Sequence, residues 1–461
     1  MTATTAVASP PSRTGHELSI LAGPIVPAIL RLAAPNAISI AALSLAVVIE
    51  TVYVGALGPA ALAANAYVFP FLVLMQTMST GAMGGGVSSA VARALGAGDL
   101  TRARTLVLHA VLIALGFGLL FTVVMRVSGA AIYGAMGAQG EILKLALTYS
   151  DVLFGGVAAI WLANTLLSVV RGTGNMAVPM VIMLSAAAAQ VVLGWALTQG
   201  AGPLPALGLA GIGWANILGQ VLAVIATVTF LFSPASRVQP ALRGVRPSWP
   251  MFRDILRVGG VAIFFSLQNA FAIIAVSAMI GGFGAAVVAG YGIGARLELL
   301  QIQIVFGFGA ALVPMVGLNI GAGQAERARR IALVGALLAG VASGVIGGGF
   351  ALAPDAWSGL YTTDAAVREA AAQYLQRVGP AYAFFGFGVC LYFATQGSGR
   401  ILGPVLVATA RLGVVLAGAA LVLAAGGGFA AVCWAITGAM VAYGLLAGAM
   451  LAFGRWGPAR R

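Results

Sequence analysis

Charged residues are scarce in this chain of 461 residues: they make up 8% of it, whereas 61% of it is hydrophobic and the mean hydropathy is +1.03. A typical soluble domain carries about 25% charged residues. A soluble core could not remove this much apolar surface from water. The composition therefore excludes a soluble globular domain and predicts a polytopic membrane protein.

Cysteine, histidine and lysine are also rare. The two cysteines, Cys390 and Cys433, lie singly inside apolar runs and lack the spacing of metal or redox motifs. No cluster of His, Asp and Glu, and no nucleophile beside a base, occurs within the apolar runs. We therefore expect neither an enzyme nor a bound cofactor. Lys144 is the single lysine against 23 arginines, which together with abundant Ala and Gly is typical of a high-GC bacterium.

Long apolar runs dominate instead, and each is long enough to cross a bilayer as a helix of about 20 residues. Charge clusters and Gly/Pro breaks divide the chain into twelve predicted spans. They are residues 31–55, 61–88, 104–125, 149–170, 178–199, 208–232, 257–281, 285–317, 331–353, 376–396, 403–425 and 429–453. The predicted fold class is all-α.

The net charge of +13 is distributed unevenly over the connections. Arginines follow the even-numbered spans, whereas the alternate connections are uncharged or mix both signs. The arginines on the basic side include Arg93, Arg102, Arg104, Arg171, Arg237, Arg243, Arg246, Arg253, Arg327, Arg329, Arg330 and Arg400. This bias follows the positive-inside rule and predicts that both termini are cytoplasmic. The basic balance thus indicates topology, and we expect no nucleic-acid partner.

The two halves of the chain resemble each other at a fixed offset. The stretch ARALGAGDLTRARTL after the second span recurs as GLNIGAGQAERARRI after the eighth, so that Arg102 matches Arg327 at an offset of 225 residues. RGTGNMAVP and QGSGRILGP match at the same offset. A repeat of six spans keeps its orientation, which predicts two six-helix bundles related by an axis along the membrane normal, with a translocation path between them.

The repeat divides the chain into five expected segments. They are a disordered cytoplasmic tail (1–24), an N-terminal six-helix lobe (25–232), a cytoplasmic linker rich in Pro and Arg (233–256), a C-terminal six-helix lobe (257–454) and a short cytoplasmic tail (455–461).

The first long apolar run, residues 32–58, contains a Pro-Asn break at Pro35 and a carboxylate at Glu50. A charge at membrane depth costs at least ~2.5 kcal/mol, so such residues usually serve function. The alternative is a side chain that reaches the outer interface. The position of the second half that corresponds to Glu50 in the repeat is Ala275 or Val276, so this acid has no counterpart there.

These motifs, VIETVYVGALG, ARALGAGD with its copy, RGTGNMAVPM and the duplication of six spans, resemble the multidrug and toxic compound extrusion (MATE) family over residues 25–450. The resemblance implies a two-lobed antiporter that exports organic, often cationic or amphipathic, compounds in exchange for protons or sodium. Its partners would be a small organic substrate, protons and the lipid bilayer.

The resemblance also carries over individual residues. The family usually has Asp where this chain has Glu50, preceded by a proline at the spacing of Pro35, which implies cation coupling at Glu50 and a hinge at Pro35. In one branch, Asn and Asp in the fifth helix complete the site, and these positions fall on Gln190 and Gly194 here. A Thr of that branch falls on Asn216. The second carboxylate is therefore missing, which favours protons over sodium.

Further polar residues within the predicted spans have two interpretations each. Gln190 and Asn216 are equally consistent with lining the cation site and with ordinary interhelical hydrogen bonds. Asn164, Gln268, Asn269 and Tyr67 are weaker candidates for the substrate cavity. Arg296, Glu298 and Arg411 are interpreted as structural charges, with Arg411 a possible partner of Glu298.

The functional hypothesis is thus a proton-coupled exporter of the bacterial inner membrane that works by alternating access. Two alternatives stay open: a flippase for lipid-linked saccharides of the same superfamily, and a sodium-coupled exporter.

Overall fold

A computed structural model describes residues 15–201, 205–241 and 244–454, and these residues form helices joined by short turns, with no strand among them. Eleven helices are long and apolar enough to cross a membrane, and a bent helix pair makes a twelfth span. The prediction of twelve spans in an all-α fold is confirmed.

The N-terminal lobe contains the first six spans. They are α2 (Ile25–Ala56), the continuous α3 (Pro59–Gln76), η1 (Thr77–Met83) and α4 (Gly84–Gly96), α5 (Leu100–Ala135), the bent pair α6 (Gly140–Gly155) and α7 (Val157–Gly172), α8 (Ala177–Gln199) and α9 (Leu209–Phe232). The axes of α6 and α7 differ by 43°.

The C-terminal lobe repeats this order. It consists of α10 (Trp249–Ile280) with η2 (Gly281–Phe283), α11 (Ala285–Gly321), α12 (Ala325–Leu352), the short α13 (Pro354–Ser358), α14 (Ala365–Val378) continuing through η3 (Gly379–Ala381) into α15 (Tyr382–Ser398), α16 (Leu402–Ala424) and α17 (Phe429–Phe453).

Helices extend beyond several predicted spans because their ends are amphipathic. The tenth span was predicted to begin at residue 376, whereas α14 begins at Ala365 and carries Arg368, Glu369 and Arg377. These charges lower the hydropathy without interrupting the helix. Likewise, α2 runs as one helix through Pro35, so the Pro-Asn pair does not interrupt it, and a hinge at Pro35 stays a prediction. The Ser39 hydroxyl donates to the Pro35 carbonyl at 2.9 Å.

Residues 15–22 differ from the predicted tail. They form α1 (Gly15–Ala22), whose Ile20 and Leu21 are buried against the rest of the molecule, so this part of the expected disordered segment is a packed helix. Residues 1–14 and the expected tail at 455–461 lie outside the described residues. The predicted linker is also shorter, because α10 already begins at Trp249.

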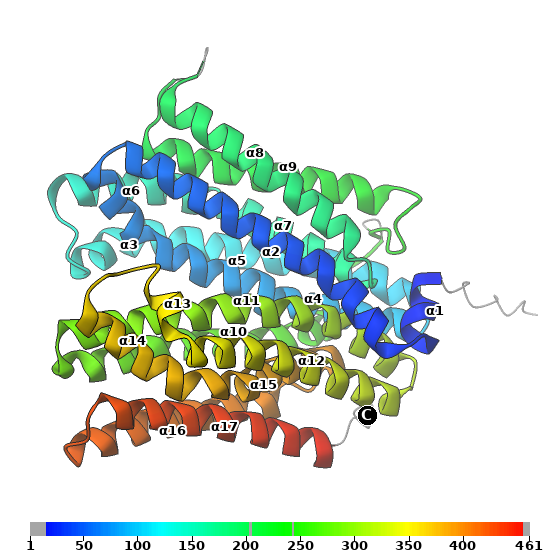
Figure 1. Cartoon of the computed structure of the whole chain (residues 1–461). Helices are drawn as coiled ribbons and strands as arrows, with labels where there is room; N and C mark the ends of the chain where they lie inside the picture. Colours follow the sequence, from blue (N-terminus) through cyan, green and yellow to red (C-terminus); the bar gives the residue numbers. More distant parts are fainter. Residues whose placement is uncertain (1–14, 202–204, 242–243, 455–461) are drawn as a thin grey trace, which may run out of the picture.

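Figure 1 shows the two lobes side by side, with α2 to α9 above α10 to α17 and both ends of the described chain at the same end of the molecule. Two arginines of α12 each contact a segment near one end of the described chain. Arg327 donates to the carbonyls of Ile20 and Gly23, and Arg329 donates to the Leu451 carbonyl at 3.1 Å.

The lobes meet most closely at the end where α4 and α11 finish, which we call the closed end. Glycines make this contact possible. A Cβ on Gly86 would lie 2.8 Å from the backbone nitrogen of Gly259 and the carbonyl of Ile255. A Cβ on Gly317 would lie 2.7 Å from Ala92. Because no side chain fits at these positions, the backbones of α4, α10 and α11 approach one another directly.

Each half begins its second span in the same way. Gly58 and Gly284 have φ angles of 104° and 97°, in the left-handed region that favours glycine, and they directly precede α3 and α11. The second span of the first half then includes the π-helical segment η1, whereas α11 is a regular α-helix over its whole length.

Candidate functional site

The predicted acid Glu50 lies inside the N-terminal lobe, on the last two turns of α2. Its side chain is buried, with 9% of the residue exposed, and Glu50 is the single buried Asp or Glu of the described residues. Gln190 on α8, also 9% exposed, donates from Nε2 to Glu50 Oε1 at 2.7 Å. The structure therefore brings together two residues that lie 140 positions apart in the sequence.

Small residues let α8 pack closely on its neighbours at this level. A Cβ on Gly219 of α9 would lie 3.2 Å from the Cβ of Gln190. Gly194, where a second carboxylate would stand, has Tyr53, Ile212 and Ala215 at ordinary contact distance around it. The position contributes no ligand, as expected from the sequence.

One further polar group lies near Glu50, and a second candidate lies on α9, which packs against α8. The Tyr149 hydroxyl of α6 is buried within electrostatic range of the carboxyl group. Asn216 on α9 is 7% exposed, and its Oδ1 atom has no hydrogen-bond partner. The site thus offers one carboxylate with one bonded amide. An ionised carboxylate gains a strong hydrogen bond from such a donor, and a protonated one removes a charge from the interior.

The weaker candidates lie in other places. Asn164 donates to Ser79 Oγ at 2.8 Å and to Gln76 Oε1 at 3.0 Å, which joins α7 to the second span. Gln268 donates to Thr409 Oγ1 at 2.5 Å, within the C-terminal lobe. Tyr67 is half-buried with its hydroxyl beside Gly137. A role of these residues in substrate binding stays a prediction.

The three charges predicted to be structural lie in the C-terminal lobe. Arg411 is buried, donates to Asn269 Oδ1 at 2.6 Å and lies over the ring of Phe385 at 5.1 Å. Glu298 accepts from the Tyr374 hydroxyl at 3.1 Å. Among the described residues, no ion pair joins Glu298 to Arg411 directly. Arg296 is exposed and lies over the Tyr361 ring.

Comparison with known proteins places this architecture in a family. The profile of the MatE family matches the chain twice, over residues 35–196 and again over residues 261–421. The chain belongs to the MATE family. The double match confirms the internal repeat, and MATE proteins are transporters rather than enzymes.

Relatives and solved structures of MATE transporters agree with this assignment. The chain is 25% identical over 376 residues to the FAD transporter of Shewanella oneidensis, which covers 82% of each protein. It is 30% identical over 314 residues to the multidrug resistance protein PmpM of Pseudomonas aeruginosa, which covers 67% of this chain and 65% of PmpM. A solved multidrug resistance MATE transporter in an outward-facing conformation superposes with a TM-score of 0.86 and 25% identity over 96% of this chain and 99% of that one.

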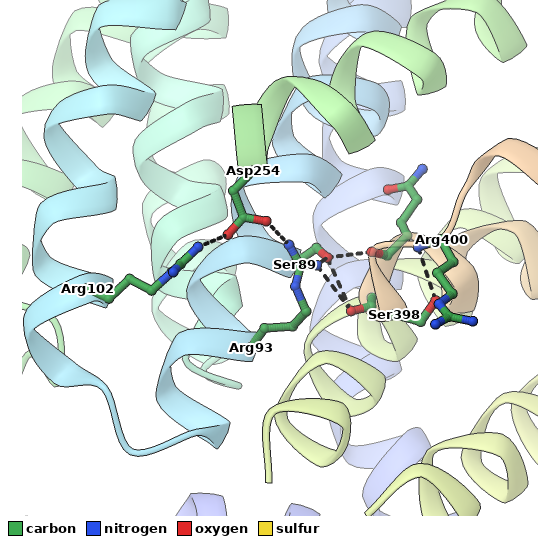
Figure 2. Close-up of polar contacts among 8 residues, drawn as sticks. Ser89, Arg93, Arg102, Asp254, Ser398 and Arg400 are labelled. Carbon is green, nitrogen blue, oxygen red and sulfur yellow. Dashed lines mark hydrogen bonds and ion pairs between the residues drawn. The ribbon is translucent and has the colours of Figure 1, made fainter. Parts of the chain in front are cut away.

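This MATE chain also has a polar contact between its lobes, which we call the closed-end lock (Figure 2). Asp254 on the first turns of α10 accepts from Arg93 of α4 at 2.6 Å and from Arg102 of α5 at 2.8 Å. Ser89 and Arg93 in turn bond to the backbone carbonyls of Gln396 and Gly397 at the end of α15. The lock therefore joins N-terminal α4 and α5 to C-terminal α10 and α15.

His109 adds a second contact between α5 and the start of α10. Its Nε2 atom accepts from the backbone N–H of Ser248 at 2.9 Å, while Nδ1 bonds to the Thr105 carbonyl. The ring is fully buried and packs edge-on against Phe252.

Sequence reasoning missed the lock and Tyr149. Arg93 and Arg102 were interpreted only as topological charges, and Asp254 was assigned to a linker. A signal was present, because Asp254 is the single acidic residue of the basic stretch 233–257.

Proposed function

We propose that this protein is a proton-coupled secondary antiporter that exports small organic compounds by alternating access between its two lobes. The observation that carries the proposal is the buried Glu50 carboxyl group with Gln190 as its hydrogen-bond donor. Among the described residues, no arginine or lysine pairs with it, so its charge can be removed by a proton without leaving a buried cation behind.

A carboxyl group in this position can couple transport to protons. Its ionised form is stabilised by the amide of Gln190, and its neutral form by the apolar surroundings. A change in either environment between two conformations alters its affinity for a proton. Protons then bind from one side of the membrane and leave on the other.

Protons suit the site better than sodium. A sodium ion needs several oxygen ligands, whereas Gly194 supplies none and Glu50 is the single buried carboxylate in the described part of the chain. The oxygen of Asn216 has no hydrogen-bond partner, but even with it, two amides and one carboxylate would make an incomplete cage.

The membrane setting follows from the family and the charge bias. The relatives named above are bacterial, which supports the bacterial inner membrane. The arginine-rich connections support cytoplasmic termini and hence a closed end on the cytoplasmic side.

The test is transport by the purified protein in liposomes, with a pH gradient or a sodium gradient imposed separately. Uptake of two fluorescent dyes, rhodamine 123 and carboxyfluorescein, would be followed in parallel. We expect the pH gradient to drive uptake of at least one dye, the Glu50→Gln variant to lose this response, and Glu50→Asp to keep part of it. Equal uptake by Glu50→Gln, or uptake driven by sodium alone, would refute proton coupling at Glu50.

A further inference from the structure

A small cavity lies between the lobes, next to the closed-end lock. Its walls come from η1, α4, α7, α11 and α15, and its volume of about 20 Å³ leaves room for a single water molecule. The polar residues and glycines that line it are Thr80, Ser88, Ser168, Arg171, Gln396, Gly81, Gly84 and Gly85.

Arg171 is the charged residue of this wall, and its surroundings do not neutralise it. The residue is 8% exposed. Its Nη2 atom contacts the sulfur of Met183 at 3.1 Å, and its Nε atom has no hydrogen-bond partner. In the described part of the chain, no carboxylate forms an ion pair with it.

Such an environment is unusual for a guanidinium group. Buried charges in proteins are normally paired or fully hydrogen-bonded, and a thioether sulfur is only a weak acceptor. A residue that anchors a helix to lipid headgroups would extend to the surface, whereas Arg171 is enclosed. Its place in the last turn of α7 favours a positive charge, but no carbonyl of that turn bonds to the side chain.

A second group in the cavity points to the same chemistry. Ser88 is 4% exposed and its hydroxyl has no hydrogen-bond partner, although it lies one residue from Ser89 of the lock. Beside Gly84 and Gly85 the wall holds the side-chain oxygens of Ser168 and Gln396, which occupy the space that a Cβ on either glycine would need. An unpaired guanidinium and a free hydroxyl together suit an anionic oxygen group.

We propose that Arg171 and Ser88 form an anion-binding subsite on the translocation path, which takes the carboxylate or phosphate group of the exported compound. The proposal rests on the proposed function, since it assigns a substrate class to that exporter. In the present conformation the subsite is too small for a substrate. Because its walls come from both lobes and it lies beside the lock, separation of the lobes at the closed end would widen it.

The test measures binding without any gradient. Carboxyfluorescein and rhodamine 123 share a xanthene ring system but carry opposite charges, and their fluorescence anisotropy reports binding to the purified protein in detergent. We expect the wild type to bind carboxyfluorescein and the Arg171→Gln variant to bind it at least tenfold more weakly. Arg171→Lys, which keeps the charge, should recover part of that loss.

Two controls make the result specific. Arg253→Gln removes an exposed arginine of α10 and should leave carboxyfluorescein binding unchanged. Rhodamine 123 should bind Arg171→Gln at least as well as it binds the wild type, which would also show that the variant is folded. If Arg171→Gln is unstable, the Ser88→Ala variant replaces it, with a smaller expected loss of about threefold for one neutral hydrogen bond.

Carboxyfluorescein binding that is unchanged in both variants would overturn the proposal, as would a wild type that fails to bind carboxyfluorescein. Neither result refutes the proposed exporter function if liposomes with the protein still take up rhodamine 123. Conversely, unaltered coupling in Glu50→Gln refutes the proposed function and leaves the subsite standing.

Discussion

Arg102 and Arg327 occupy equivalent positions in the two halves, and each holds the start of the other lobe's first span. Arg102, at the start of α5, bonds to Asp254 in the first turns of α10 at 2.8 Å. Arg327, at the start of α12, bonds to the carbonyls of Ile20 and Gly23 directly before α2. Arg102 bonds to a carboxylate, whereas Arg327 bonds to backbone carbonyls. The repeated arginine therefore has a charged partner only in the first half.

The carboxylate of the lock should control how often the closed end opens. Asp254→Asn removes the charge that Arg93 and Arg102 share, and hydrogen bonds to charged groups contribute about 1.5–3 kcal/mol. These side chains are partly exposed. We therefore expect the equilibrium to shift by about 1–2 kcal/mol, or roughly 5- to 30-fold, towards the conformation in which the lobes are separated at the closed end. Spin labels at the exposed positions Thr101 and Gln324 would measure this as a larger population at long distance.

A matched pair within one lobe serves as the control for that prediction. Arg368 bonds to Asp355 at 2.7 Å, and both residues belong to the C-terminal lobe. Asp355→Asn should leave the distance distribution as in the wild type. The lock has no conformational role if Asp254→Asn gives the same distribution too.

Releasing the other arginine should loosen α1. Arg327→Gln removes the guanidinium bonds to Ile20 and Gly23 and leaves Asn319 as a donor to Ile20, so backbone amides of residues 15–23 should exchange with deuterium about 5- to 30-fold faster, for a loss of about 1–2 kcal/mol. Hydrogen exchange with mass spectrometry measures this directly. Arg330→Gln, which breaks only an exposed pair with Glu326, is the control and should not change exchange in this segment.

Two glycines should respond in opposite ways to the same substitution. Gly86→Ala places a Cβ 2.8 Å from the backbone of α10 and should cost about 1–3 kcal/mol through overpacking of the closed end. Gly194→Ala meets its neighbours at 3.7–3.8 Å and should stabilise α8 by about 0.5–1 kcal/mol. Thermal unfolding in detergent compares the two variants. Equal effects would show that the lobes do not constrain Gly86.

Gln190 should set the pH range of coupling. Gln190→Leu keeps the size of the side chain but removes the donor to Glu50, which destabilises the ionised carboxylate by about 1.5–3 kcal/mol and leaves the protonated form nearly unaffected. Proton release then needs a higher pH, and the midpoint of pH-dependent dye uptake should rise by about 1–2 units. Gln199→Leu alters an exposed residue of the same helix and should leave the midpoint in place.

Much of this architecture could be predicted from the sequence. Hydropathy identified all twelve spans, because each must be apolar to face lipid. Resemblance to MATE sequences paired Glu50 with Gln190, and the structure shows their hydrogen bond.

Contacts between spans could not be predicted in the same way. The local sequences around Arg171 and Asp254 resemble those at other arginine-rich ends of spans, and the roles of these two residues depend on which helix of the other lobe lies opposite. The helical ends of α14 were missed because a charged amphipathic segment resembles a connection when hydropathy alone is read.

The π-helical segment η1 also records an event in the history of the duplication. Gly58 and Gly284, before the second span of each half, are 226 residues apart, whereas Gly98 and Gly323, after that span, are 225 apart. The first half therefore contains one extra residue between them, and a π-segment is how a helix accommodates a single insertion. By this count the partner of Glu50 is Val276, and the π-segment absorbs the added residue within the second span, so the helix continues on either side of it.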